Sequence, residues 1–363
     1  MLGAAAACLL GGVWLPGAWG ELPAFSLLRL AGQAPEWAHG VEGTPASLGG
    51  AALGIPRVFH RSHKRAAAEA HKDQRLWANL RSCAQLNPGY ETRYYDDGQV
   101  DALLQRLVDE LGNRTLRAAL RRLSVRPLSS AFVLRADWFR LAVLYLEGGW
   151  WLDADVRCVD GLDEALGSGP LAGAVAAALT TAAPGPVEAG CVLAWEGELP
   201  QPASAPLNWA LGCAPGHRLL LEAVAELAGR VLRVRPQEEQ DPFAARVPTR
   251  EGPRYVDVLH TTGPGMLGDA LTAYAGRDLR EVRAAFGEVA ERPETWDQVS
   301  AVVPENSTLA PTAVVVLPYC FFRSRGCAHL QRRFGDRVVF HHEFDTSWRP
   351  SFWHNYAEPT AEL

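Results

Sequence analysis

Residues 135–156 read RADWFRLAVLYLEGGWWLDADV, and this stretch decides the fold class that the sequence predicts. Its first half, to about Leu146, is apolar on nearly every side, which is typical of a helix buried over most of its surface. Gly148-Gly149 can end that helix, and residues 150–156 follow as an apolar strand. A buried helix that leads directly into a buried strand indicates a layered α/β structure.

The flanking sequence repeats this alternation of short apolar strands and helices, which favours an α/β architecture for the whole ordered chain. Asn87-Pro88-Gly89 marks the end of one predicted helix, and Ser129 or Ser130 can cap the helix that leads into the strand. The predicted strands are 55–60, 91–95, 150–156, 312–317 and 337–340, and the predicted helices are 66–86, 99–111, the one ending near 146, and 217–232.

Two acids at the end of the predicted strand 150–156 are the main candidates for chemistry. Residues two apart in an extended segment project to the same face, so Asp153 and Asp155 present their carboxylates together. Two like charges so close are costly unless a cation neutralises them. Hard cations such as Mg²⁺ or Mn²⁺ choose oxygen ligands and often bind substrate phosphates. An Asp-x-Asp pattern is more often a solvated turn, but its place after an apolar strand favours a metal site that binds a diphosphate.

Asp137 and Arg140 are three apart on the preceding helix and therefore share a face. An ordinary surface ion pair would fit poorly on a helix that otherwise lacks a polar face. Because a buried ion pair is expensive, this one is more plausible where it binds something. The sequence predicts that Arg140 contacts a phosphate or a sugar hydroxyl and that Asp137 accepts hydrogen bonds from hydroxyls.

The composition is that of a globular protein and excludes one functional class. Of 363 residues, 48% are hydrophobic and 21% are charged, so a packed core is expected. The formal net charge is −6. Nucleic-acid-binding domains usually concentrate Lys and Arg on a strongly basic face, so no nucleic-acid partner is expected.

The ends of the chain differ from the middle. Residues 1–20 contain no charged side chain, which predicts a signal peptide or a short membrane anchor; a buried or loosely ordered segment is the alternative. Residues 21–54 are rich in Gly, Ala and Pro, as in a linker or stalk. The ordered domain is predicted over 55–350, followed by a C-terminal tail, 351–363.

Two further features favour the secretory route. The triplets that begin at Asn113 and Asn306 are possible N-glycosylation sites. Beyond Cys8 there are six cysteines, which permit three disulfides with 15 connectivities in an oxidising lumen; buried free thiols are the alternative. No Cys-x-x-Cys pair occurs, so a zinc site of the usual spacing is not expected.

The stretch FHHEFDTSWRP, residues 340–350, is the other polar and aromatic cluster. Its side chains can supply metal or phosphate contacts, although a His-His pair near a C-terminus is more often on the surface. The candidates are His341, His342, Ser347 and Trp348.

Seven segments, in order from Ile55 to Pro350, together resemble glycosyltransferase family 32, the sugar-binding-region family with a DxD motif. Within it they are most similar to initiation-specific α-1,6-mannosyltransferases, because of the TGPG run from Thr262 and the His-x-Phe-x-x-Ser-Trp-Arg-Pro ending. The segments are IPRVFHRSHK, NPGYETRYYDD, RADWFRLAVLYLEGGWWLDADV, APLNWALGCAPGH, TTGPGMLGDAL, VVVLPYCFF and HEFDTSWRP.

The resemblance implies a GT-A fold, with a Rossmann-like nucleotide-binding half and a mixed central sheet, and a retaining transfer. It implies a GDP-mannose donor, Mn²⁺ or Mg²⁺, a glycan or glycolipid acceptor, and a single-pass type II Golgi membrane protein with a lumenal catalytic domain, or a lumenal one if the N-terminus is cleaved. Its residue roles are metal binding by Asp153, Asp155 and His342, catalysis by Asp153, Asp155 and Arg140, and donor binding by Asp137, Arg140, Trp151, His60, Ser347 and Trp348. Trp151 departs from the family's usual Tyr.

Three other readings stay open at the level of sequence. An inositol-phosphoceramide mannosyltransferase or another glycolipid hexosyltransferase would use the same site. WWLDADV also resembles the motif of haloacid-dehalogenase-like phosphatases, with Asp153 as nucleophile, but here it lies far into the chain and no Asp-Asp pair follows it. A catalytically silent scaffold fits less well because both aspartates are present.

Overall fold

The structure, a computed structural model, describes residues 54–63, 72–125, 131–182, 188–196, 205–233, 246–249, 252–255, 262–276, 300–302, 312–317, 322 and 339–342. All of them lie in one compact unit, Gly43–Leu363. The predicted signal or anchor, nearly all of the predicted linker, and the predicted tail lie outside these residues. Across the described helices, none has both the length and the apolar composition that a membrane span requires.

The central sheet has eight strands in the order β10-β11-β5-β7-β3-β1-β2, with β6 paired to β5. Strands β2, β1 and β3 are parallel, β7 runs antiparallel to β3 and β5, β11 is parallel to β5, and β10 is antiparallel to β11. The predicted α/β class with a mixed central sheet is confirmed. These strands are β1 Val58–Ser62, β2 Glu91–Tyr95, β3 Gly149–Leu152, β5 Glu188–Glu196, β6 Ala205–Pro206, β7 Ala210–Cys213, β10 Ser300–Val302 and β11 Thr312–Leu317.

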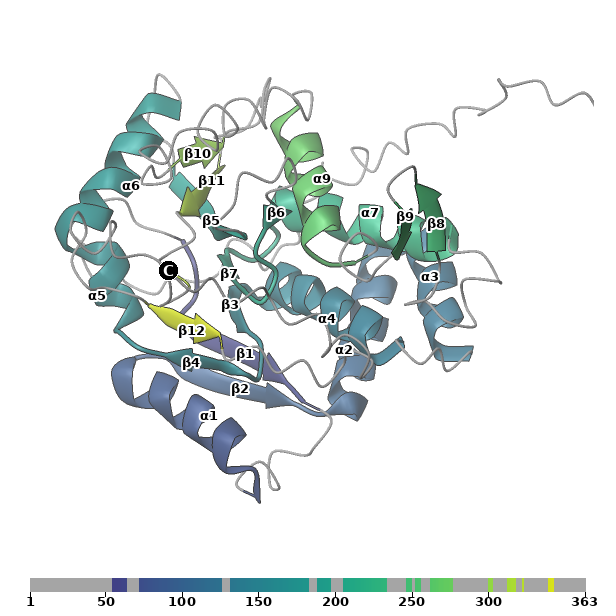
Figure 1. The fold of residues 1–363 in the computed structure, drawn as a ribbon, viewed down its shortest axis with the longest axis horizontal. Coiled ribbons are helices and arrows are strands. Elements are labelled where there is room, and N and C mark those ends of the chain that lie inside the picture. The colour runs from purple at the N-terminus through teal and green to yellow at the C-terminus, as the bar shows by residue number, and fades with distance from the viewer. Residues whose placement is uncertain are drawn as a thin grey trace, which may run out of the picture. The chain divides into compact units, whose positions relative to one another are not determined.

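Helices cover both faces of this sheet (Figure 1). One apolar cluster joins α2, α3, α4, α7 and α9 to one face of the sheet, through residues such as Trp151, Leu211 and Val316. The other joins α5 and α6 to the opposite face, through residues such as Trp150 and Val315. The helices are α1 Gln74–Leu86, α2 Asp97–Leu111, α3 Arg114–Val125, α4 Ala131–Glu147, α5 Leu162–Gly167, α6 Gly169–Ala182, α7 Arg218–Arg233 and α9 Pro264–Ala275.

Four short strands lie outside the central sheet. β4 (Val156–Cys158) pairs with β12 (Phe340–His342), and β8 (Arg246–Thr249) pairs with β9 (Gly252–Tyr255), both antiparallel. The β4–β12 pair places the end of the described chain beside the segment that follows β3, which matters for the site.

The prediction of one strand over 150–156 is wrong. β3 ends at Leu152 and β4 begins at Val156, because the intervening residues form a turn in which Val156 N donates to Asp153 O (3.0 Å). The two acids therefore lie together on a turn rather than along a pleat.

Helix ends also differ from the predictions. α1 begins at Gln74, where the Asp73 side chain accepts a hydrogen bond from Leu76 N. α2 begins two residues before the predicted Gln99, because Asp96 and Gln99 form a reciprocal capping box. α3 was not predicted.

Two disulfides connect elements of the structure. Cys83–Cys158 joins α1 to β4, and Cys191–Cys213 joins the neighbouring strands β5 and β7. The alternative of free thiols is therefore wrong for these four cysteines, while Cys320 and Cys327 lie outside the described residues.

Candidate functional site

The turn between β3 and β4 brings together three side chains that could hold a metal ion. Asp153 and Asp155 come from the turn, and His342 comes from β12, where it is paired with Val156. One ligand atom from each of the three residues lies within 4.8 Å of the other two. His342 Nε2 is 3.4 Å from Asp155 Oδ1. Residues more than 180 apart in sequence thus converge at one point.

The donor set of this cluster fits a hard divalent cation. Carboxylate oxygens are the preferred ligands of Mg²⁺ and Mn²⁺, and an imidazole nitrogen suits first-row transition metals. All three side chains are half-buried, so they are reachable from solvent and partly shielded from it. Two carboxylates this close also need a positive charge nearby.

Arg140 supplies a positive charge inside the protein. Its Nη2 lies 2.8 Å from Asp137 Oδ1 and 3.3 Å from Asp153 Oδ1, and its Nη1 donates to Asn208 O. The Arg140 side chain is 7% exposed, so these contacts are shielded from water. Arg140 therefore connects α4 to the first acid of the turn.

Asp137 pairs with Arg140, and both of its carboxylate oxygens contact protein groups. Thr262 Oγ1 donates to Oδ2 (2.5 Å), and Asn208 Nδ2 lies 3.4 Å from Oδ1 beside Arg140. Burial raises the pKa of Asp137, and the Arg140 guanidinium opposes that rise. The predicted contact between Asp137 and sugar hydroxyls stays a prediction.

Trp151 contacts the site through its ring nitrogen. Nε1 donates to Asp153 Oδ1 (2.6 Å), and the Arg140 guanidinium lies over the ring, 5.6 Å from its centroid. The side chain is buried. The indole N–H thus orients the Asp153 carboxylate. The predicted contact of Trp151 with the donor stays a prediction.

His60 is packed inside the protein at the other end of β3. Its Nε2 donates to Gly148 O (2.8 Å), so Nδ1 accepts from Tyr95 Oη (2.9 Å). Burial lowers the pKa of His60 to about 4, so the ring is neutral at pH 7. Protein groups thus occupy both ring nitrogens of His60. Its predicted contact beside the nucleotide stays a prediction.

Ser347 and Trp348, the remaining predicted donor contacts, lie outside the described residues. Sequence reasoning missed the roles of Asn208 and Thr262, although both fall within segments that carried the resemblance. No local pattern relates Thr262 to Asp137, which is 125 residues away. Arg61, which lies behind the turn, was also missed.

Comparisons with known proteins agree with this geometry over part of the chain. Residues 73–170 match the family model described as "Glycosyltransferase sugar-binding region containing DXD motif". This range contains Asp137, Arg140, Asp153 and Asp155. No curated protein matches the sequence.

Two solved structures are among those similar to this chain. One is titled "PaToxG Glycosyltransferase": it is 17% identical, with a TM-score of 0.39, and the match covers 66% of this chain and 77% of that one. The other is described as a transferase mutant with two cysteine-to-serine substitutions: it is 12% identical, with a TM-score of 0.26, and the match covers 52% of this chain and 83% of that one.

Proposed function

We propose that this protein is an enzyme that moves a hexose from a nucleotide-diphosphate sugar to a glycan in a metal-dependent, retaining reaction. The match of residues 73–170 to the model of a glycosyltransferase sugar-binding region with a DXD motif supports the proposal. The convergence of Asp153, Asp155 and His342 carries this proposal. In a GT-A fold the nucleotide would bind at the parallel half of the sheet, β2-β1-β3, where β3 leads into the turn.

Asp153, Asp155 and His342 would hold Mn²⁺ or Mg²⁺. Such an ion, when bound, offsets the negative charge that builds up on a departing diphosphate. The protein's own contribution is to hold the ligands close together in a partly shielded place. Trp151 and Arg140 both contact Asp153 Oδ1 and restrict its carboxylate to one orientation.

Arg140 adds a fixed positive charge beside the metal-binding carboxylate. Its buried position strengthens its electrostatic effect on a nearby phosphate, because water screens it little. Asp137, held by Thr262 and Asn208, keeps the guanidinium in place. The acceptor hydroxyl attacks on the face from which the diphosphate leaves, which accounts for retention without a second catalytic carboxylate.

The donor is GDP-mannose and the reaction is that of an α-1,6-mannosyltransferase acting in protein N-glycosylation. The TGPG run from Thr262 supports this choice, and in the structure its last two residues, Pro264 and Gly265, begin α9. Transfer to an inositol-phosphoceramide or another glycolipid is the alternative, since it would use the same donor site.

The enzyme works in the Golgi lumen, anchored by residues 1–20 as a type II membrane protein or released if that segment is cleaved. The uncharged N-terminal segment supports this location. The disulfides Cys83–Cys158 and Cys191–Cys213 also support it, because disulfides persist in oxidising compartments.

A phosphatase with Asp153 as nucleophile has less support. Asp153 Oδ1 is already engaged by Trp151 Nε1 and Arg140, which would lower its reactivity toward a phosphate ester.

A thermal-shift panel of nucleotide sugars, with and without Mn²⁺, tests the function. GDP-mannose with Mn²⁺ is expected to raise Tm more than either alone and more than UDP-galactose with Mn²⁺; ligand at a hundred times its Kd contributes about 2.7 kcal/mol. A larger shift with UDP-galactose would contradict the donor alone. If no nucleotide sugar shifts Tm in the presence of Mn²⁺, the enzyme proposal is wrong.

A further inference from the structure

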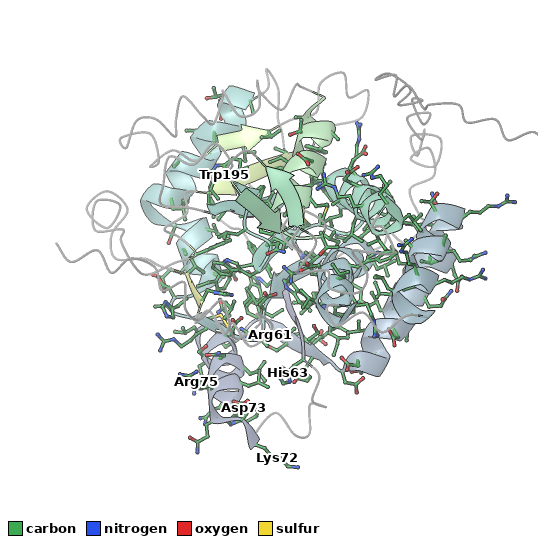
Figure 2. All side chains as sticks on the ribbon, turned by 45° about the vertical axis from the view of Figure 1, so that its right-hand side comes forward. Arg61, His63, Lys72, Asp73, Arg75 and Trp195 are labelled. Carbon is green, nitrogen blue, oxygen red and sulfur yellow. A yellow bond between two sulfur atoms is a disulfide. The ribbon has the colours of Figure 1, made fainter. Side chains whose placement is uncertain are left out.

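Arg61 is a buried cation directly behind the turn that carries the metal-binding acids. It comes from β1 and has no exposed surface. Figure 2 labels it in the lower half of the view. Burying a guanidinium is expensive unless its donors are satisfied and its charge is balanced. Its partners therefore indicate what it does.

Those partners lie along the turn and the adjoining disulfide. Arg61 Nη1 donates to Val156 O (2.8 Å) and, at longer range, to Asp153 O (3.4 Å). Its Nη2 donates to Cys83 Sγ (2.8 Å), which belongs to the disulfide that ties α1 to β4. One planar group thus connects both ends of the turn to a covalent cross-link.

The positive charge of Arg61 complements the negative charges of the two acids on the turn. A guanidinium stays protonated in proteins, so Arg61 places a positive charge behind the turn that carries Asp153 and Asp155. A positive charge on the inner side of the turn reduces the cost of holding two carboxylates together before a cation arrives.

A second buried side chain supports the turn from α1. Asn79 Nδ2 lies 3.4 Å from Ala154 O, and Ala154 packs against Leu76 and Leu80. Together with Arg61, these contacts account for the carbonyl groups of Asp153, Ala154 and Val156. The backbone of the turn is thereby fixed by groups that a ligand outside it would not touch.

We propose that Arg61 is a positioning residue for the metal ligands: its guanidinium fixes the backbone of the turn, so that the Asp153 and Asp155 carboxylates converge before any cation binds. This inference rests on the proposed function of the turn as a metal site. It assigns to Arg61 no contact with substrate or metal.

The test measures binding of Mn²⁺ alone to the full chain, from the electron paramagnetic resonance signal of free Mn²⁺. Arg61→Lys keeps the charge but loses the fork that reaches two partners at once. Loss of a residue that orients metal ligands typically weakens binding about 10- to 100-fold, and a rise of this size in Kd is expected for Arg61→Lys.

A matched control separates positioning from general stability. Leu227→Ala removes buried side-chain volume from α7, in the apolar cluster on the other side of the sheet from Cys83 and Cys158. It is expected to lower Tm and leave the Mn²⁺ Kd unchanged at temperatures where the protein is folded. If folded Arg61→Lys binds Mn²⁺ as tightly as the wild type, Arg61 does not position the ligands.

Two further arms complete the experiment. Asp155→Ala must lose Mn²⁺ binding; if it binds like the wild type, or if the wild type binds none, the metal site itself is refuted rather than the role of Arg61. Should Arg61→Lys fail to fold, the double variant Cys83→Ala with Cys158→Ala decides, because it removes the anchor of Nη2 and leaves Arg61 in place. Weaker Mn²⁺ binding supports the inference, and unchanged binding overturns it.

Discussion

Each acid at the site has an identifiable partner that orients it or balances its charge. Asp153 is held by Trp151 and Arg140, Asp155 lies beside His342, and Asp137 is enclosed by Thr262 and Asn208. Because hydrogen bonds to charged groups are worth more than neutral ones, loss of one partner has a measurable cost. Two substitutions test this at the scale of single residues.

Trp151→Phe removes the indole N–H that donates to Asp153 Oδ1 and keeps an aromatic ring. The lost hydrogen bond to a carboxylate is worth about 1.5–3 kcal/mol, so donor turnover at limiting Mn²⁺ is expected to fall about ten-fold or more. Trp77→Phe is the control, because Trp77 is 42% exposed on α1. Unchanged turnover in Trp151→Phe would show that the contact does not orient Asp153.

Thr262→Val removes the hydroxyl that donates to Asp137 Oδ2 while keeping the shape of the side chain. The buried carboxylate then lacks one partner, which is expected to lower the free energy of unfolding by about 1–3 kcal/mol. Thr180→Val is the control, since Thr180 is exposed on α6 and its hydroxyl donates to Ala176 O in the same helix. Urea unfolding measures both, and equal stabilities would refute a structural role for Thr262.

At the scale of elements, the site depends on where β3 stops. Trp150 on β3 lies opposite Gly212 on β7, and a Cβ at Gly212 would come within 2.5 Å of the Trp150 ring. Gly212→Ala must therefore displace either the ring or the strand that leads into the metal-binding turn.

Gly212→Ala is expected to destabilise the protein by about 1–3 kcal/mol and to lower donor turnover through the shift of β3. Gly173→Ala is the matched control: no atom lies within 4 Å of its added Cβ, and in a helix interior it should stabilise by about 0.5–1 kcal/mol. Thermal unfolding gives both signs. A Gly212→Ala protein as stable as the wild type would contradict the packing described for β3 and β7.

The elements also show how far sequence reasoning reaches. β2 and β11 have the predicted bounds, because turn-forming residues or prolines flank each of these short strands. α3 was missed although Leu116, Leu120 and Leu123 give the helical spacing and are buried. The break after Leu152 was missed because a continuous strand and a strand that is interrupted by a turn can show the same alternation of apolar and polar residues.

Only part of the site could be predicted from the sequence, and the reason is physical. Asp153 and Asp155 are two residues apart, and Asp137 and Arg140 are three apart. Spacing in the sequence alone therefore brings the two members of each pair together. The contacts of Thr262 with Asp137 and of Arg61 with Val156 join distant segments. Such contacts arise from the pairing of strands and the packing of helices, which local patterns do not encode.

At the scale of the whole molecule, two buried histidines make stability depend on pH. Burial lowers the pKa values of His60 and His217 to about 4, from 6.5. Below pH 6.5 the two histidines bind protons in the unfolded chain but stay mostly neutral in the folded chain. The free energy of unfolding therefore falls as pH drops from 6.5 toward 4. The slope is up to about 1.4 kcal/mol per pH unit for each histidine.

Urea unfolding at pH 7.5, 6 and 5 measures this slope. In His217→Gln one of the two contributions is absent, so the loss of stability between pH 6 and 5 is expected to be smaller than in the wild type. Equal slopes in the two proteins would show that His217 does not stay neutral when folded.

Turnover by Asp155→Ala tests the central claim, that the turn after β3 holds a cation for a diphosphate. The measurement is nucleotide release from the sugar donor that the thermal-shift panel identifies, with Mn²⁺, for the wild type, Asp155→Ala and the exposed control Asp109→Ala. We predict that Asp155→Ala loses turnover by about a thousand-fold and keeps the metal-free Tm, while Asp109→Ala matches the wild type. Turnover by Asp155→Ala at the wild-type rate would contradict the assignment.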